Sequence, residues 1–85
     1  MKLTLLTRVG CHLCDEMKSV VARVARTVPL TLEEIDISAD PVLERRYGVE
    51  IPVLLVNGTK AAKYRLTEAA LLRILAARAG AADRP

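Results

Sequence analysis

The order of apolar segments in the first 40 residues constrains the fold most. Residues 3–7 form a short apolar run typical of a buried strand, and residues 30–37 form a second one. Between them, apolar side chains recur at intervals of three and four over residues 14–28, which predicts one face of a helix. Pro29 ends that helix, because proline cannot continue it. A helix between two strands predicts a parallel strand–helix–strand crossover.

The next segment predicts a short helix followed by a third strand. Asp40 is a helix-capping residue, and Pro41 suits the first turn. We expect this helix to end at Gly48 in the left-handed conformation that glycine adopts easily. Residues 51–56 are apolar and predict the third strand.

A hairpin and a last helix complete the chain. Asn57-Gly58 is the strongest short-range hairpin signal, so residues 59–66 form a fourth strand, with charged residues on one face that suit a sheet edge. Thr67 caps a helix over residues 68–79, which Gly80 ends. Its expected packed face contains Leu71, Ile74, Leu75 and Arg78.

These elements predict an α/β chain of order βαβαββα. It forms a four-stranded mixed sheet with helices on both faces. Eighty-five residues suffice for one domain, which we expect over residues 1–80, followed by a frayed tail over residues 81–85. The chain has no Phe or Trp, so its core is aliphatic.

Charge and hydropathy limit the partners and the location. The net charge is +3, but the basic residues are spread among ten acidic ones and no aromatic platform accompanies them, so we expect no nucleic-acid partner. No apolar run approaches the roughly 20 residues of a membrane span. The first residues are too short for a signal-peptide core, so we expect a cytoplasmic location, where both cysteines are reduced.

The two cysteines lie where the first strand ends and the first helix begins, in the motif Cys11-His12-Leu13-Cys14. Free amide groups and the helix dipole stabilise an anion there, so Cys11 is expected to ionise easily and attack a disulfide. Cys14, one turn further on, is expected to resolve the mixed disulfide. The alternative is that both cysteines are small buried apolar residues.

Two cations are candidates for tuning the Cys11 thiolate. Protonated His12 would stabilise it, and Arg8 lies three residues before it. Either side chain also fits an ordinary solvated surface position. Pro52 has two interpretations as well: it opens a strand where no ladder donor is needed, or it forms a cis peptide bond that exposes backbone groups to a substrate.

With the dithiol placed, the chain resembles the glutaredoxin-like branch of the thioredoxin superfamily over about residues 2–79. The matching pieces are residues 3–14, residues 49–54 and the Asn57-Gly58 hairpin. The resemblance implies a thioredoxin-like, glutaredoxin-type fold in which Pro52 is cis and faces the dithiol. It also implies that the backbone of Ile51 pairs with an incoming thiol compound or peptide.

The chain departs from the glutaredoxin pattern at two places. His12 and Leu13 replace the common Pro and Tyr between the cysteines, and residues 64–68 lack the Gly-Gly and acidic motif that helps to hold glutathione. Thr67 and the helix N-terminus nevertheless provide a place for a carboxylate.

Three functions are compatible with these features. The first is a monomeric thiol–disulfide oxidoreductase without a bound cofactor, which reduces protein or low-molecular-weight disulfides; glutathione or a thioredoxin-reductase-type donor is its expected reductant. The second is a metal or iron–sulfur carrier, which would need ligands beyond Cys11, Cys14 and His12, from a second subunit or an outside thiol. The third is a non-catalytic binding module on the same fold.

Overall fold

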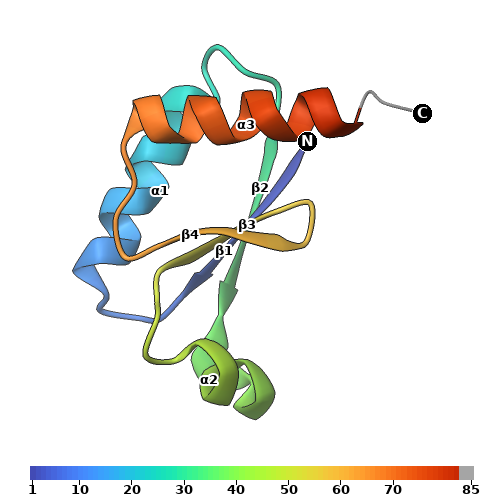
Figure 1. The fold of residues 1–85 in the computed structure, drawn as a ribbon. Helices are drawn as coiled ribbons and strands as arrows, with labels where there is room; N and C mark the ends of the chain where they lie inside the picture. The colour runs from blue at the N-terminus through green and yellow to red at the C-terminus, as the bar shows by residue number, and fades with distance from the viewer. Residues whose placement is uncertain (83–85) are drawn as a thin grey trace.

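The computed structural model describes residues 1–82 and contains the predicted order of elements (Figure 1). They are β1 (Lys2–Thr7), α1 (His12–Val24), β2 (Thr31–Asp36), a 3-10 turn (Ile37–Ala39), α2 (Pro41–Tyr47), β3 (Val53–Val56), β4 (Thr59–Lys63) and α3 (Glu68–Ala82). The strand order is β2-β1-β3-β4. β1 and β2 are parallel, whereas β3 is antiparallel to both β1 and β4. The predicted mixed sheet is therefore confirmed, with β4 at its edge.

Two core clusters lie on opposite faces of the sheet. α1 and α3 cover one face, where their apolar residues pack on those of β1 and β3 (Figure 1). α2 packs near one end of the other face, against a smaller cluster around Leu6, Ile37 and Val53. The buried residues of the larger cluster are Leu3, Leu5, Met17, Val20, Val21, Val24, Leu54, Val56, Leu71 and Leu75. Helices on both faces follow from the alternation of side chains along the strands.

The first helix is shorter at its C-terminal end than its apolar pattern predicts. It ends at Val24 rather than near Val28. The amides of Arg26 and Thr27 bond three residues back instead of four, which tightens the chain into a turn. Pro29 disfavours the helical conformation at the residue before it, and Val28 still packs partly against the core.

The hairpin between β3 and β4 is confirmed, but β4 is shorter than predicted. Asn57 and Gly58 both have positive φ, 50° and 87°, as the tightest hairpin turns require. β4 ends at Lys63 because Tyr64 has φ 66°, which no strand accommodates. This turn at Tyr64 leads the chain away from the sheet towards α3.

Two predictions about glycines were wrong. Gly48 has φ −55°, in the right-handed rather than the left-handed region. Glycine is needed there for a different reason, since a Cβ would collide with the Glu44 carbonyl. Gly80 does not end α3, which continues to Ala82. An interior glycine costs a helix only about 1 kcal/mol, and the alanines that follow favour helix. The remainder of the predicted tail, residues 83–85, lies outside the described residues.

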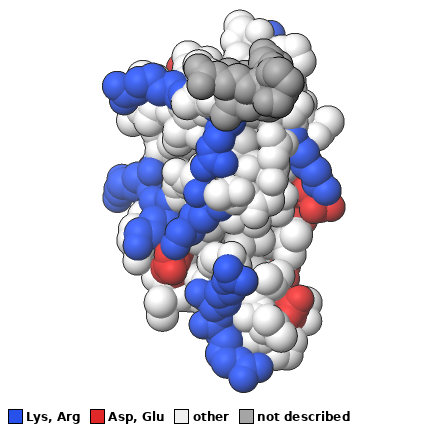
Figure 2. Space-filling model, turned by 45° about the vertical axis from the view of Figure 1, so that its right-hand side comes forward, with Lys and Arg blue, Asp and Glu red and all other residues white. Residues whose placement is uncertain are grey.

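Among the described residues, no helix is both long and apolar enough to cross a membrane. Figure 2 shows Lys and Arg side chains in several groups on one face, with uncharged surface and acidic side chains between them. This spacing agrees with the scatter of basic residues along the sequence. The absence of a nucleic-acid partner stays a prediction.

Two adjacent leucines of α3 allow a matched test of the core. Leu71 is fully buried, whereas Leu72 is 44% exposed. We expect Leu71→Ala to lower the free energy of unfolding by about 2–5 kcal/mol, because it leaves a cavity between α3 and the sheet. Leu72→Ala should change it by less than about 0.5 kcal/mol. Urea unfolding followed by circular dichroism measures both, and equal losses would contradict the packing of α3.

Candidate active site

The site begins at the loop between β1 and α1. Gly10 has φ 81°, which glycine adopts without strain. The Cys11 amide donates to the Arg8 carbonyl over 3.2 Å and closes the turn. Cys11 then takes the N-cap position of α1, with extended backbone angles. The end of the strand and the start of the helix therefore meet at Cys11, as predicted.

Cys11 and Cys14 form a disulfide pair with their Cα atoms 5.2 Å apart, within the range that disulfides require. Cys11 is partly exposed, whereas Cys14 is only 3% exposed. The Cys14 amide donates to the Cys11 sulfur over 3.1 Å. An amide donor and the helix dipole at the same sulfur stabilise negative charge on it. Cys11 is therefore both the more exposed cysteine and the one whose sulfur is stabilised as an anion.

The Ile51-Pro52 peptide bond is cis, as the resemblance implies. Leu6 of β1 pairs with Val53 of β3, and these are the last residues of that ladder. Because the two strands are antiparallel, Pro52 lies at the sheet end where β1 leads into the cysteine loop. Pro52 is buried, and its carbonyl accepts from the Tyr64 amide over 2.9 Å. Ile51, partly buried, lies just beyond the ladder.

The Arg8 side chain is paired with α2. Its guanidinium donates to Glu44 of α2 and forms an ion pair with it. This hydrogen bond raises the pKa of Arg8 above its ordinary value. Hydrogen bonds from Ser38 lower the pKa of Asp36, with a smaller contribution from the Arg8 charge. The structure therefore gives Arg8 a role in joining the cysteine loop to α2, and its effect on the Cys11 thiolate stays a prediction.

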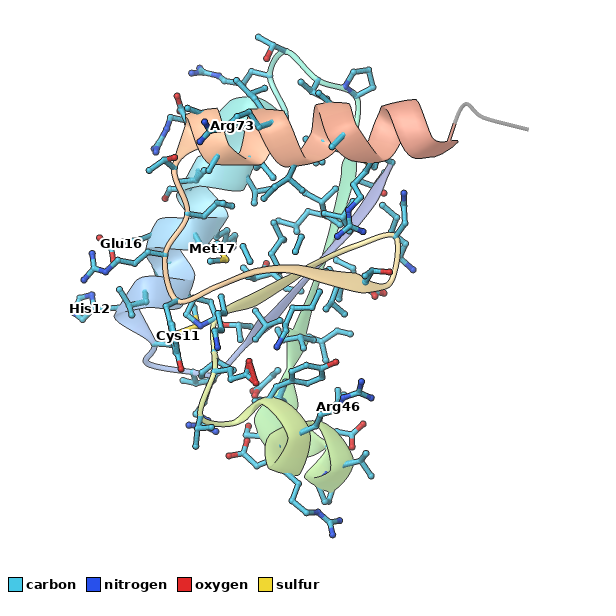
Figure 3. All side chains as sticks on the ribbon, viewed as in Figure 1. Cys11, His12, Glu16, Met17, Arg46 and Arg73 are labelled. Atoms are coloured by element: carbon cyan, nitrogen blue, oxygen red, sulfur yellow. A yellow bond between two sulfur atoms is a disulfide. The ribbon has the colours of Figure 1, made fainter. Side chains whose placement is uncertain are left out.

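His12 is exposed in the first turn of α1, and its side chain points away from the protein (Figure 3). Cys11 lies on the other side, towards the sheet. Within the described residues, the structure gives the His12 ring no hydrogen bond. Its predicted effect on the thiolate would have to act through solvent at the helix start.

Thr67 caps α3 as predicted, since its hydroxyl accepts from the Ala70 amide over 3.1 Å. It also lines a groove of about 360 Å³ that the sequence analysis did not detect. One wall of the groove is residues 64–67. The other wall is formed by six residues of α1: Leu13, Glu16, Met17, Ser19, Val20 and Arg23. Leu13 lies between the two cysteines in the sequence, so the end of the groove at Leu13 is the one nearer to the disulfide.

Tyr64 is a site residue that the sequence did not reveal. It has positive φ, which is strained for an aromatic residue. Its amide donates to the Pro52 carbonyl, and its hydroxyl donates to the Val49 carbonyl over 3.2 Å. Tyr64 therefore connects the groove to the loop before Pro52. Strained backbone often lies at functional sites, but no motif in the sequence marks this position.

The described residues contain no group of three His, Cys, Asp or Glu side chains that could hold a metal ion. One chain would supply Cys11 and Cys14 as thiol ligands to a metal ion or cluster. The carrier hypothesis thus still needs ligands from outside this part of the chain.

Glu50, beside the Ile51-Pro52 bond, provides a pH-dependent test of this loop. Lys60 Nζ lies 2.8 Å and Lys63 Nζ 3.7 Å from its carboxylate. The Lys60 hydrogen bond lowers the pKa of Glu50 below its ordinary value, and the charges of both lysines add to this. Because its pKa is lowered in the folded protein, ionised Glu50 stabilises the fold at pH values above its pKa in the unfolded chain. This stabilisation is lost as the pH falls through the pKa of Glu50 in the folded protein.

We therefore expect Lys60→Met to raise the pKa of Glu50 and to weaken the loss of stability on acidification. NMR titration of the Glu50 carboxyl carbon measures this change. Lys2→Met removes a lysine that contacts Glu33 instead and should leave Glu50 unchanged. An unaltered Glu50 titration in Lys60→Met would disprove the contact.

Comparisons with known proteins agree with this geometry. The model of the Glutaredoxin-like domain (DUF836) matches residues 2–76. A structural-genomics target protein from X. campestris is 32% identical, with a TM-score of 0.76 over 88% of this chain and 96% of that one. A protein from Nitrosomonas europaea is also 32% identical, with a TM-score of 0.74 over 85% and 87%.

More distant structures share the fold. Thioredoxin 1 from Thermosipho africanus is 15% identical, with a TM-score of 0.67 over 99% of this chain and 100% of that one. A search of curated proteins found no significant match. The family model covers most of the chain. The residues that it matches include the cysteine pair, the cis-proline and all four strands of the sheet. The chain therefore belongs to the glutaredoxin-like domain family.

Proposed function

We propose that this protein is a thiol–disulfide oxidoreductase that reduces protein or low-molecular-weight disulfides. The observation that carries the proposal is the Cys11–Cys14 pair at the start of α1. Cys11 is partly exposed and its sulfur receives an amide hydrogen bond, whereas Cys14 is buried. Thiolates attack disulfides, and a buried second thiol is protected until the first has reacted.

The reaction takes two exchange steps. The Cys11 thiolate attacks one sulfur of a substrate disulfide, which forms a mixed disulfide and releases the other substrate sulfur as a thiolate. The Cys14 thiol loses its proton and attacks the Cys11 sulfur, which releases the second substrate thiolate. The substrate gains two electrons, the protein becomes the Cys11–Cys14 disulfide, and water protonates the released thiolates. An external thiol reductant, such as glutathione or a reductase-type donor, then restores the dithiol.

The substrate would approach past the loop that ends at Pro52. The backbone of Ile51 lies beyond the last paired residues of β1 and β3, so it is placed to pair with an extended peptide or thiol compound. The predicted thiolate-tuning roles of His12 and Arg8 stay predictions, and the pairing of the Arg8 guanidinium with Glu44 partly offsets its charge. A cytoplasmic location and a monomeric state stay predictions.

Single cysteine substitutions separate the two roles. We expect Cys11→Ser to abolish the reduction of a small disulfide such as bis(2-hydroxyethyl) disulfide, because it removes the attacking sulfur. Cys14→Ser should still attack but should accumulate the mixed disulfide. Turnover coupled to a thiol reductant measures the first effect, and intact-protein mass spectrometry measures the second. Equal turnover in wild type and Cys11→Ser would refute the proposal.

The reduction potential distinguishes a reductase from an oxidant. We expect the Cys11–Cys14 couple to lie at roughly −200 to −270 mV, the range of glutaredoxins and thioredoxin. Equilibration in glutathione redox buffers with thiol trapping measures it. If no buffer produced the intramolecular disulfide, the two-cysteine mechanism would be wrong.

A further inference from the structure

The loop between α2 and β3, residues 48–52, carries Ile51 at the sheet end that leads into the cysteine loop. Among residues 1–82, the backbone amide and carbonyl of Ile51 bond to no other backbone group. Val49, at the centre of the loop, is 88% exposed, so packing of its side chain does not fix the loop. A loop of this kind needs anchors from another segment to keep one conformation, because ordering a backbone lowers its entropy.

Tyr64 anchors this loop at two carbonyls. Its amide donates to the Pro52 carbonyl over 2.9 Å, and its hydroxyl donates to the Val49 carbonyl over 3.2 Å. These two carbonyls belong to residues on either side of Ile51 in the chain. Figure 1 shows the loop and the segment that follows β4 at the same end of the sheet, near the start of α1. One residue from outside the loop therefore bridges it across Ile51.

The lysine before Tyr64 adds to these anchors. Lys63 Nζ lies 5.3 Å from the centre of the Tyr64 ring and 3.7 Å from the Glu50 carboxylate. An ammonium group near the face of an aromatic ring attracts the ring. The ring and the carboxylate of the loop thus share one cation, which keeps the ring next to the loop that its hydroxyl contacts.

Tyr64 makes these contacts in a strained conformation. Its φ of 66° lies in the left-handed region, where a residue with a Cβ is strained and glycine is not. The residue is 43% exposed, so burial of the ring does not account for a tyrosine at this position. Strained residues persist where surrounding interactions hold them, and they gather at functional sites. The two hydrogen bonds to the loop are interactions of this kind.

From these observations we infer that Tyr64 is a positioning residue for disulfide exchange, which holds residues 49–52 in one conformation and keeps the backbone of Ile51 available to an incoming peptide. This inference rests on the proposed function and adds a residue that acts through the loop. A peptide that pairs with a loop already held in place does not have to order it, which removes part of the entropy loss on binding. A disulfide without a peptide backbone gains nothing from this arrangement.

The chain provides a matched pair of substitutions, because it has two tyrosines. Tyr64→Phe removes only the hydroxyl and with it the hydrogen bond to the Val49 carbonyl. Tyr47→Phe is the control, since within the described residues the Tyr47 hydroxyl forms no hydrogen bond. Tyr64→Gly removes the ring and the hydroxyl but relieves the backbone strain. Circular dichroism checks that each variant folds.

Three disulfides serve as probes. The first is the peptide Ser-Ala-Cys-Ala-Ser with a chromogenic thiol as a mixed disulfide, the second is the same peptide with N-methylated amides, and the third is bis(2-hydroxyethyl) disulfide. We expect Tyr64→Phe to lower the rate constant with the first peptide, relative to those with the other two probes, about fivefold. One lost hydrogen bond between uncharged groups has an effect of about this size. Tyr64→Gly should lose at least as much, and Tyr47→Phe should keep the wild-type ratios.

The carbonyl carbon of Val49 gives a readout that does not depend on activity. Its NMR chemical shift changes with the hydrogen bond that the carbonyl accepts. We expect this resonance to move in Tyr64→Phe and to stay in place in Tyr47→Phe.

The outcomes separate the inference from the function on which it rests. If the Val49 resonance does not move in Tyr64→Phe, or if Tyr64→Phe or Tyr64→Gly keeps the wild-type ratios, Tyr64 does not position the loop and the proposed function stands. An equal fall with all three probes would assign the effect to the cysteines and would also overturn the inference. No reaction of the wild type with any disulfide would overturn both proposals.

Discussion

The Cys14 amide can donate to the Cys11 sulfur only because Cys11 occupies the N-cap of α1. A helix start has several amides without partners in the helix, and a side chain at the cap usually accepts from them. Here that side chain is the reactive one. The same interaction that begins the helix therefore also stabilises charge at the sulfur, so the position of the site depends on where α1 begins.

The position of α1 depends in turn on the sheet. The apolar face of the helix packs against Leu3 and Leu5 of β1, which leaves the helix start at the end of that strand. The antiparallel pairing of β1 with β3 then brings Pro52 to the same end. Residues separated by about 40 positions in the chain thus form one site because a single central strand pairs on both of its sides.

The charges near the site belong to several separate pairs. Arg8 is neutralised by Glu44, Arg23 by Glu68, and Glu50 by two lysines of β4. These exposed pairs contribute little to stability, but each one joins a loop or helix end to a neighbouring element. The helix start and the Cys14 amide act on the Cys11 sulfur directly. Because these charges are balanced within local pairs, the net charge of +3 does not describe the surroundings of the disulfide.

The sequence by itself determined the order of the elements, the hairpin, the caps at Asp40 and Thr67 and the place of the dithiol. These are local features: apolar periodicity, turn residues and capping side chains act within a few residues. The resemblance to glutaredoxins added the cis bond at Pro52, which local rules left open.

Tertiary structure decided everything that joins distant segments. It directed Arg8 to α2, gave Tyr64 its positive φ beside Pro52, and formed the groove between α1 and the segment before α3. It also ended β4 early and placed Gly48 in a right-handed conformation. No local pattern encodes such features, because each depends on which surfaces meet when the helices pack on the sheet.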